Sequence, residues 1–395
     1  MSKEKRRVPK LRFPGFTEDW EQRKLDNIAK IKTGGGTPKT TNLEYWSGDI
    51  PWIQSSDLVE GDVVHVNIKK FIDNNALKNS AAKLISRDSI ALVTRVGVGK
   101  VAVINQDFTT SQDFLSLSDF DGNDIKFIAY QLFRLMQENA KVLQGTSIKG
   151  ISKTDLIEQS IAIPNSIKEQ NLIASLLSQT DSIITLHQRK LNNLKLKKKA
   201  LLQKLFPKNG KRYPELRFPG FTDAWEQRKL SEVTTCFDNL RVPVTASDRV
   251  PGKIPYYGAN GIQDYVSGHT HSGEFVLIAE DGANDLNDYP IQYVNGAIWV
   301  NNHAHVIAGY KEKLENKFLS YSLKTVKMTT FIVGGGRSKL NLKALLEIPI
   351  SMPNYDEQCV IGKFIETIDI NITLHQRKLD HLQLQKKALL QQMFV

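Results

Sequence analysis

The octapeptide ITLHQRKL occurs twice in this chain of 395 residues, at Ile184–Leu191 and again at Ile372–Leu379. Each copy lies inside a longer match that continues to Phe206 in the first copy and to Phe394 in the second, at an offset of 188 residues. A repeat of this length indicates an internal duplication, which decides how the rest of the chain is interpreted.

A second pair of matching segments lies upstream of the first. LRFPGFTEDWEQRKL at residues 11–25 corresponds to LRFPGFTDAWEQRKL at residues 216–230, at an offset of 205 residues. The segments between the upstream and downstream repeats share little identity with each other. The chain therefore carries two copies of one frame, and each copy holds a different insert.

The downstream repeats have the spacing of long helices. Apolar residues recur at alternating intervals of four and three, which is the pattern of a coiled-coil seam. The predicted seam residues are Ile173, Leu177, Ile184, His187, Leu191, Leu194, Leu201, Leu205, Ile361, Ile365, Ile368, Ile372, His375, Leu379, Leu382, Leu389 and Met393. Gly362 predicts an irregular start for the second helix. Lys198 and Lys386 share the seam, and we expect their ammonium groups to extend from its edge into solvent.

A single helix with an exposed apolar seam would be unstable, so each repeat needs a partner helix, and the nearest is the other repeat. Two-fold pseudo-symmetry then makes the pair antiparallel. The predicted fold is α/β (α+β), with two mixed α/β domains joined by two long antiparallel coiled-coil helices. The predicted segments are a basic tail (1–8), a first domain (9–163), a central helix (164–207), a second domain (208–352) and a C-terminal helix (353–395).

Composition limits the class of protein. No apolar run is long enough for a transmembrane helix, and the basic start lacks the apolar stretch of a signal peptide. With only Cys236 and Cys359, neither a disulfide framework nor a cysteine zinc site is expected, and a cytoplasmic protein is predicted. The net charge of +11 is concentrated between Asp181 and Glu215, where ten lysines and arginines occur without an acidic residue. This stretch is either a solvated helix face or a surface that attracts a polyanion.

The inserts are rich in β-branched residues separated by loops of glycine and asparagine. DSIALVTRVGVGKVAVI (88–104) predicts a hairpin in the first insert, and GEFVLIAEDGA and NGAIWVNNHAHVIAG predict strands in the second. Amide, guanidinium and ammonium side chains on such loops can bind base edges, although such a residue taken alone is more often an ordinary turn or surface residue. The candidates are Lys39, Thr41, Arg95, Lys100 and Gln112 in the first insert, and Asn260, Gln263, Asn284, Asn301 and Asn302 in the second.

Two further loops precede the long helices at corresponding places, GTSIKGISK (145–153) and GGGRSKLNLK (334–343). Their small residues and cations would suit a phosphate backbone, or they are tight turns with solvent-facing cations. The candidate phosphate contacts are Ser147, Lys149, Arg337, Ser338 and Lys339.

The sequence carries no recognisable catalytic signature. GVGKVAV lacks the spacing and the hydroxyl residue of a nucleotide-binding P-loop, and no dinucleotide-binding glycine pattern is present. The histidines of HTH (269–271) and HAH (303–305) could in principle form a zinc site, which would favour a nuclease. Histidines in a buried polar network are commoner, so no metal is predicted.

The order of these motifs resembles the specificity (S) subunits of type I restriction-modification enzymes. The resemblance covers essentially the whole chain. It rests on WEQRKL at Trp20–Leu25 and Trp225–Leu230, on TGGGTPKTTNLEYWSGDIPWI in the first insert, and on IPYYGANGIQDYV with WVNNHAHVIAG in the second. The EQ pairs at 169–170 and 357–358 also fit.

The resemblance implies that each insert is a target recognition domain for one half of a split, asymmetric DNA sequence. The paired helices would set the gap between the halves and would dock two modification subunits that methylate adenine at N6. Restriction subunits would join that core. S-adenosylmethionine, ATP and Mg would belong to the partner subunits, and no cofactor is expected in this chain. A purely structural coiled-coil protein is the remaining alternative, and it leaves the unequal inserts unexplained.

Overall fold

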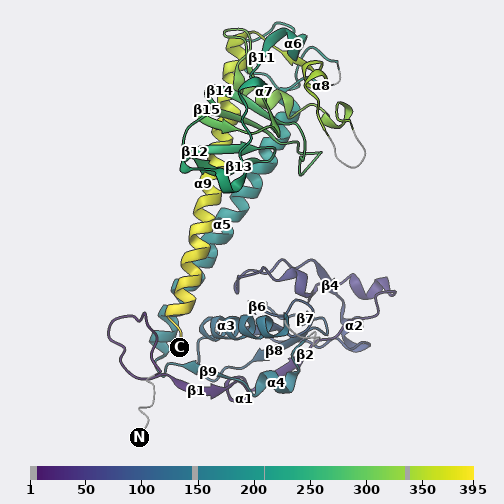
Figure 1. Cartoon of the computed structure of the whole chain (residues 1–395). Helices are drawn as coiled ribbons and strands as arrows, with labels where there is room; N and C mark the ends of the chain where they lie inside the picture. Colours follow the sequence, from purple (N-terminus) through teal and green to yellow (C-terminus); the bar gives the residue numbers. More distant parts are fainter. Residues whose placement is uncertain (1–6, 145–149, 209, 334–338) are drawn as a thin grey trace. The chain divides into compact units, whose positions relative to one another are not determined.

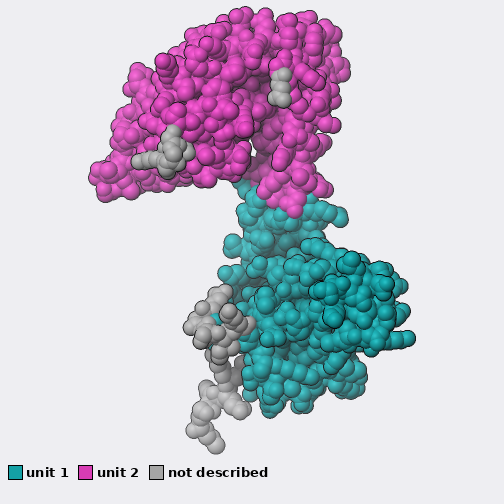
Figure 2. Space-filling view, turned by 90° about the vertical axis from the view of Figure 1, so that its right-hand side faces the viewer, with its two compact units in different colours: residues 1–189, 376–395 teal, residues 190–375 magenta. Residues whose placement is uncertain are grey.

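The computed structural model describes residues 7–144, 150–208, 210–333 and 339–395. They form two compact units, coloured separately in Figure 2: unit 1 comprises residues 1–189 and 376–395, and unit 2 comprises residues 190–375. Each unit contains one insert and part of both long helices, α5 (Ile167–Leu205) and α9 (Tyr355–Gln392), which are labelled in Figure 1. The boundary between the compact units therefore falls near the middle of each long helix. The segments predicted from the sequence instead gave each helix a segment of its own.

Unit 1 contains a four-stranded antiparallel sheet, a three-stranded sheet and a two-stranded ribbon. The strand orders are β2-β8-β5-β6, β4-β3-β7 and β1-β9, and β3 and β7 are parallel. The strands are β1 (Glu21–Lys24), β2 (Ile31–Gly34), β3 (Ile50–Ile53), β4 (Lys70–Ile72), β5 (Ser89–Val93), β6 (Val101–Ile104), β7 (Thr109–Thr110), β8 (Phe114–Ser118) and β9 (Ser160–Ile163). The helices are α1 (Leu25–Ile28), α2 (Asn74–Lys78), α3 (Ile125–Gln144) and α4 (Lys153–Ile157), and α3 packs against β5, β6 and β9.

The hairpin predicted for residues 88–104 is confirmed. Strands β5 and β6 pair antiparallel, with Ser89 opposite Ile104. Their connection contains Gly97 and Gly99, which have φ values of 88° and 111°. Glycine tolerates this left-handed region because it has no Cβ, so these two residues allow the chain to reverse between the strands.

Unit 2 is built on one six-stranded sheet with the order β11-β16-β14-β15-β12-β13. Its pairs are antiparallel except β12 with β15. The strands are β11 (Thr234–Cys236), β12 (Pro251–Gly258), β13 (Gly261–Val266), β14 (His271–Ala279), β15 (Ile291–Val300) and β16 (Ala304–Gly309), and a ribbon joins β10 (Glu226–Lys229) to β17 (Pro349–Met352). The short helices are α6 (Leu230–Val233), α7 (Asn316–Leu323) and α8 (Leu342–Leu346), and α7 packs against β14, β15 and β16.

The long helices are antiparallel within each unit. In unit 1, Leu177 of α5 shares a core with Leu390 of α9, while Asp181, one turn further along α5, meets Lys386, one turn earlier in α9. Contacts that advance along one helix while receding along the other define an antiparallel pair. In unit 2, Lys198 meets Asp369, and Leu205 shares a core with Ile361 and Ile365.

The predicted seam positions face inward. Residues on the same helices but off the seam, such as Leu186 and Leu196, are exposed. The buried seam residues are Ile173, Leu177, Leu191, Leu205, Ile361, Ile365, Ile368, Leu379, Leu382 and Met393, and the half-buried ones are Ile184, His187, Leu194, Leu201, Ile372, His375 and Leu389.

The expected irregularity at Gly362 is wrong, because α9 runs without interruption from Tyr355 to Gln392. Gly362 is instead a point of close packing. A Cβ at this position would lie 2.7 Å from Glu315 Oε2 and 3.2 Å from both Lys317 Cβ and the Phe318 backbone nitrogen. Glycine here lets α9 approach the start of α7, and this gain outweighs its low helix propensity.

Each unit closes its core with an aromatic cluster that includes the end of a long helix. In unit 1, Phe394 from the α9 end packs on Trp20 and stacks on Phe127, at centroid distances of 6.1 and 5.5 Å. In unit 2, Phe206 from the α5 end packs in the same way on Trp225 and Phe318, at 5.9 and 5.4 Å. The duplicated WEQRKL and helix-end motifs therefore form the same cluster twice.

The duplicated Glu-Gln pair at the start of each long helix has a structural role. Buried Glu169 accepts two hydrogen bonds from Arg12, at 2.7 and 2.9 Å, and buried Glu357 accepts two from Arg217, both at 2.8 Å. A bidentate arginine satisfies a buried carboxylate on both oxygens. These pairs attach the upstream repeat to the long helices.

Within the described residues, none of the helices combines the length and the apolar character that crossing a membrane would require.

Candidate nucleic-acid interface

One edge of unit 1 brings together three loops that carry predicted base-reading residues. The Thr37 hydroxyl donates to Gln112 Oε1, which ties the glycine-rich loop to the turn before β8. The backbone nitrogen of Gly36 donates to the carbonyl of Thr110 at 2.9 Å, and that of Thr94 donates to the carbonyl of Asp113 at 2.8 Å. The ends of β2, β5 and β7 therefore lie beside the start of β8.

The predicted base-reading residues of unit 1 separate into two groups on this edge. Lys39, Thr41, Arg95 and Gln112 are exposed. Lys100 is half-buried, and its ammonium donates to the carbonyls of Ser55 and Leu58 at 3.1 Å each. Lys100 thus fixes the neighbouring 3-10 turn, and its donors face the protein and not the open edge.

A cation-π cluster on the three-stranded sheet of unit 1 was not anticipated from the sequence. The Lys70 ammonium lies 5.6 Å from the Trp46 ring centroid and 5.4 Å from that of Trp52. The Trp52 indole nitrogen donates to the Gly36 carbonyl at 3.0 Å. The cluster therefore holds the glycine-rich loop in place through Trp52. The two tryptophans of the WSGDIPW motif are the sequence feature from which the cluster could have been predicted.

The second candidate site lies at one end of the large sheet in unit 2. Asn260, in the β12–β13 turn, donates to the carbonyl of Gly282 at 2.8 Å and accepts from the backbone nitrogen of Asn284 at 3.0 Å. One side chain therefore joins two of the predicted loops. His303 completes the cluster with a contact of 2.6 Å between Nδ1 and Asp281 Oδ1.

Asn301 is the structural centre of this cluster. It is 4% exposed, its Oδ1 accepts from the His303 backbone nitrogen at 2.8 Å, and its Nδ2 approaches Gln263 Oε1 at 3.4 Å. Asn301 therefore orders the loop after β15. Gln263 and Asn302 are exposed beside it.

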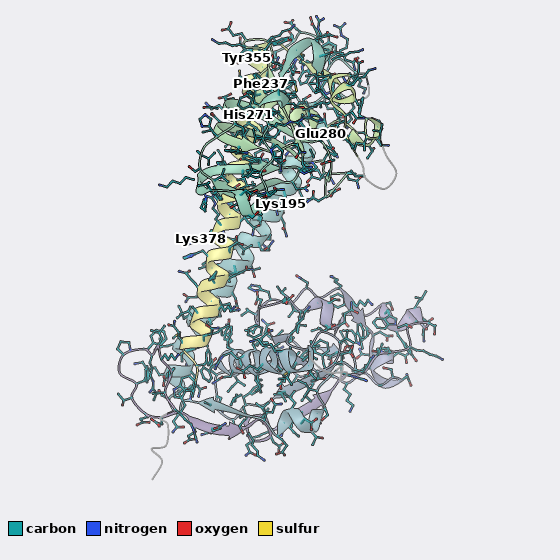
Figure 3. The ribbon with its side chains drawn as sticks, in the orientation of Figure 1. Lys195, Phe237, His271, Glu280, Tyr355 and Lys378 are labelled. Atoms are coloured by element: carbon teal, nitrogen blue, oxygen red, sulfur yellow. The ribbon has the colours of Figure 1, made fainter. Side chains whose placement is uncertain are left out.

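The four histidines of the HTH and HAH segments in unit 2 do not converge on one point. His271 is buried, with Nε2 donating to the Phe237 carbonyl at 3.0 Å and Nδ1 accepting from the Thr270 hydroxyl at 2.7 Å; His271 and Phe237 are labelled in Figure 3. Burial lowers the pKa of His271, in keeping with a neutral ring. His269 is exposed, and His303 and His305 bind different carboxylates. Because these histidines have different bonding partners, the two pairs do not form the common zinc site that the sequence left open.

Buried His305 belongs to a separate, partly buried ion network. Its Nδ1 lies 2.6 Å from Asp238 Oδ2, and its Nε2 lies 2.8 Å from the Leu340 carbonyl. Asp238, Glu280 and His305 place their ligand atoms within 4.8 Å of one another, a spacing that could suit a metal ion. However, Arg241 binds Glu280 at 2.7 Å and Lys339 binds it at 2.9 Å. These two cations neutralise the carboxylates, so the network needs no metal for charge balance.

The loops before the long helices lie mostly outside the described residues. Ser147, Lys149, Arg337 and Ser338 fall in the ranges 145–149 and 334–338. Lys339 is described, and its ion pair with Glu280 ties the end of the second loop to the partly buried ion network.

The expectation that Lys198 and Lys386 extend into solvent is wrong. In unit 1, the Lys386 ammonium contacts Asp181 and the Gly61 carbonyl, and its side chain is only 7% exposed. The Tyr130 hydroxyl donates to the other Asp181 oxygen at 2.7 Å. Burial raises the pKa of Asp181, while the charge of Lys386 acts in the opposite direction.

Unit 2 repeats the same triad. The Lys198 ammonium lies 2.5 Å from Asp369, whose second oxygen accepts from the Tyr321 hydroxyl at 2.8 Å. Each triad joins α5, α9 and one helix of the recognition insert. The buried Asp181 carboxylate requires partners of this kind, whereas Asp369 holds Lys198 at a site that is 34% exposed on the carboxylate side.

These features define a class of protein: two loop-bearing α/β domains held on one duplicated, basic helical frame. The family model for the type I restriction modification DNA specificity domain matches residues 17–196 and 222–384. The chain therefore belongs to the type I restriction-modification specificity subunits.

Individual relatives agree with this assignment. The chain is 46% identical over 161 residues to a putative type I restriction enzyme specificity subunit of Haemophilus influenzae, covering 41% of each chain. It thus spans less than half the length of that relative. It is 25% identical over 362 residues to a type I restriction enzyme specificity subunit of Escherichia coli, covering 87% of this chain and 86% of that one. The crystal structure of an S subunit from M. genitalium has the same fold, with a TM-score of 0.74 at 19% identity, covering 98% of this chain and 99% of that one.

Proposed function

We propose that the chain reads a bipartite, asymmetric DNA site and is itself non-catalytic. Unit 1 would recognise one half-site and unit 2 the other. The long helices would dock two adenine-N6 methyltransferase subunits, which restriction subunits would join. S-adenosylmethionine, ATP and Mg would then act in those partners.

The observation that carries this proposal is the contrast between the identical frame and the unequal recognition edges. The aromatic cluster, the Arg–Glu pair and the Tyr–Asp–Lys triad occur once in each unit. The loops above them differ in sequence, sheet and polar residues. Two identical readers would require a palindromic site, whereas different readers on matched supports suit an asymmetric one.

The direct test exchanges residues 9–163 for the equivalent insert of another specificity subunit. Sequencing of methylated DNA from cells that carry the chimera should show one half-site replaced and the other unchanged. The matched exchange of residues 208–352 should replace the other half. Two half-sites that change together in either chimera would refute the two-reader arrangement.

A second experiment tests the spacer role of the helices. Deleting one heptad from each, residues 188–194 and 376–382, removes about 10 Å of helix at 1.5 Å per residue. We expect the unspecified gap in the methylated motif to shorten by about three base pairs, with both half-sites retained. A methylated motif with its original gap would exclude the spacer role.

A further inference from the structure

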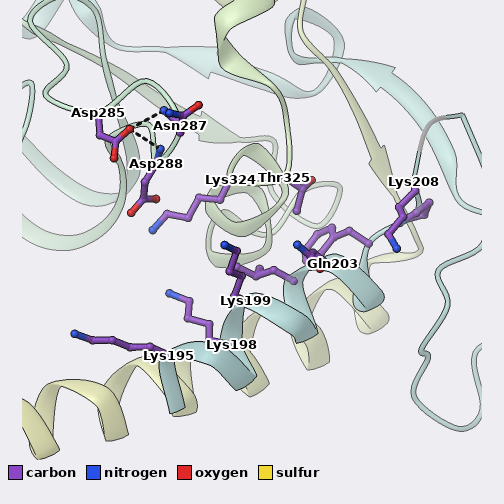
Figure 4. Close-up of a pocket in the computed structure, with 13 residues that line it drawn as sticks. Lys195, Lys198, Lys199, Gln203, Lys208, Asp285, Asn287, Asp288, Lys324 and Thr325 are labelled. Atoms are coloured by element: carbon purple, nitrogen blue, oxygen red, sulfur yellow. Dashed lines mark hydrogen bonds between the residues drawn. The ribbon is translucent and has the colours of Figure 1, made fainter. Parts of the chain in front are cut away.

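A cavity of about 670 Å³ lies within unit 2, between the last turns of α5, the loop at 285–288 and the end of α7 (Figure 4). Its lining is strongly cationic. The lysines around it are Lys195, Lys198, Lys199, Lys208 and Lys324. Figure 4 shows Lys195, Lys198 and Lys199 on α5 and Lys324 on the facing segment.

Within the part of the chain that the structure describes, two of these lysines form salt bridges and three do not. Lys198 is paired with Asp369, and Lys208 is paired with Glu215 at 2.8 Å. Among the described residues, Lys195, Lys199 and Lys324 form no ion pair. On the opposite wall, the Asp285 carboxylate accepts from the backbone nitrogens of Asn287 and Asp288 in its own loop, at 2.8 and 3.2 Å.

The equivalent positions in unit 1 show that the frame does not require two of these cations, Lys195 and Lys324. Tyr130 and Tyr321 occupy matching positions, since each donates to the aspartate of its triad. Three residues further along, unit 1 has buried Phe133 where unit 2 has Lys324. Gln383 likewise occupies the position in α9 that corresponds to Lys195 in α5. Unit 2 therefore carries additional charge at these two positions, whereas Lys199 corresponds to Lys387 in α9.

Concentrating cations around one cavity has an electrostatic cost. Desolvation by the cavity wall lowers the pKa of Lys324, and the nearby charge of Lys198 lowers it further; Asp288 and Asp369 oppose this only in part. An anion bound in the cavity would offset the repulsion between Lys324 and Lys198 and would attract the other lysines of its lining. The charges that surround the cavity therefore favour an anionic ligand.

We propose that this cavity and the adjoining face of α5 bind phosphates of one DNA strand beside the half-site that unit 2 reads. The assignment rests on the proposed DNA-binding function. Lysine is a point charge suited to phosphate contact without base specificity. The loop at 285–288 directly follows Asn284, a predicted base-reading residue, so a strand bound at that loop would pass the cavity. The basic stretch continues along the chain to Arg212 without an acidic residue.

The test replaces all three unpaired lysines, Lys195→Gln, Lys199→Gln and Lys324→Gln, in the full chain assembled with its modification subunit. Glutamine already stands at the position equivalent to Lys195 in α9, so the frame tolerates it. The matched control removes three exposed lysines elsewhere in unit 2, Lys311→Gln, Lys313→Gln and Lys363→Gln. Affinity for duplex DNA is measured over a range of salt concentrations.

We expect the slope of log affinity against log salt to become shallower by about 2.7 in the cavity variant, at about 0.9 for each phosphate that a lysine no longer neutralises. Specific and non-specific duplexes should weaken by the same factor, and the methylated motif should not change. The control should keep the wild-type slope. An unchanged slope in the cavity variant, or an equal change in the control, would overturn the site.

Two further outcomes would also overturn it. In the first, the cavity variant no longer binds the modification subunit, while the salt dependence of its DNA affinity is unchanged. The occupant of the cavity would then be an acidic protein surface. In the second, calorimetry shows that the wild-type protein binds inorganic phosphate and that the variant does not, while the salt dependence of DNA affinity is the same for both. The ligand would then be a free anion. A wild-type complex that bound no duplex would instead remove the proposed function, and the site with it.

Discussion

Replacing Phe394 with alanine is expected to destabilise unit 1 by about 3–5 kcal/mol and to leave unit 2 near its wild-type stability. Phe394 is 3% exposed, and its ring contacts Trp20 and Phe127 from the opposite end of the sequence. Removing the ring leaves a cavity among large aromatic side chains that cannot easily collapse. The loss of stability should therefore lie at the upper end for a core substitution.

Phe206→Ala is the matched variant, because Phe206 makes the same contacts in unit 2 with Trp225 and Phe318. Hydrogen exchange followed by mass spectrometry would resolve the two units peptide by peptide. Phe394→Ala should speed exchange in β5, β8 and α3, and Phe206→Ala should speed exchange in β14, β16 and α7. Faster exchange in both units from either variant would contradict the assignment of each helix end to one core.

The duplicated frame could be predicted from the sequence because its residues repeat in matching order. The four-and-three spacing around Leu177 and Leu379 identified the helices and their inward face. Antiparallel pairing followed from symmetry and from the absence of another partner. The hairpin at 88–104 was also predictable, since its β-branched residues flank two glycines.

The polar contacts inside the frame could not be predicted from periodicity. The seam pattern predicts that Lys386 lies at the solvent edge, because periodicity within one helix does not reveal a carboxylate on the neighbouring helix. A signal was nevertheless available. Asp181 and Asp369 are identical at the repeat offset of 188, as are Lys198 and Lys386. Matched charged residues of opposite sign in two antiparallel copies indicate a cross-helix pair.

The recognition edges were predictable only as loops. Asn260 and Asn301 have side chains able to read bases, yet both also hold neighbouring loops in place. Lys100 is bound to two carbonyls of a turn that is distant in sequence. Such bonds depend on how strands meet at a sheet edge, and local composition does not determine that geometry.

Lys386→Met should destabilise unit 1 by about 3–5 kcal/mol near neutral pH, because it leaves the Asp181 carboxylate buried without its cation. Asp181 is 1% exposed and would keep only the hydroxyl of Tyr130. The matched variant Lys198→Met in unit 2 should cost about 1 kcal/mol or less, since the Asp369 side chain is 34% exposed and water can solvate it. The double variant Lys386→Met with Asp181→Asn should recover much of the lost stability, because no charge then remains buried.

The destabilisation by Lys386→Met should also depend on pH. Burial already raises the pKa of Asp181 in the folded protein, and removing the opposing charge of Lys386 raises it further. A folded carboxyl with a raised pKa retains a proton that the unfolded chain releases, so stability falls as pH rises through that interval. Denaturant unfolding of unit 1 can be monitored by hydrogen exchange at about pH 5 and at about pH 8. The variant should be destabilised less at the lower pH. Equal destabilisation at both pH values, or in the Lys386 and Lys198 variants, would show that the buried charge does not control the stability of this unit.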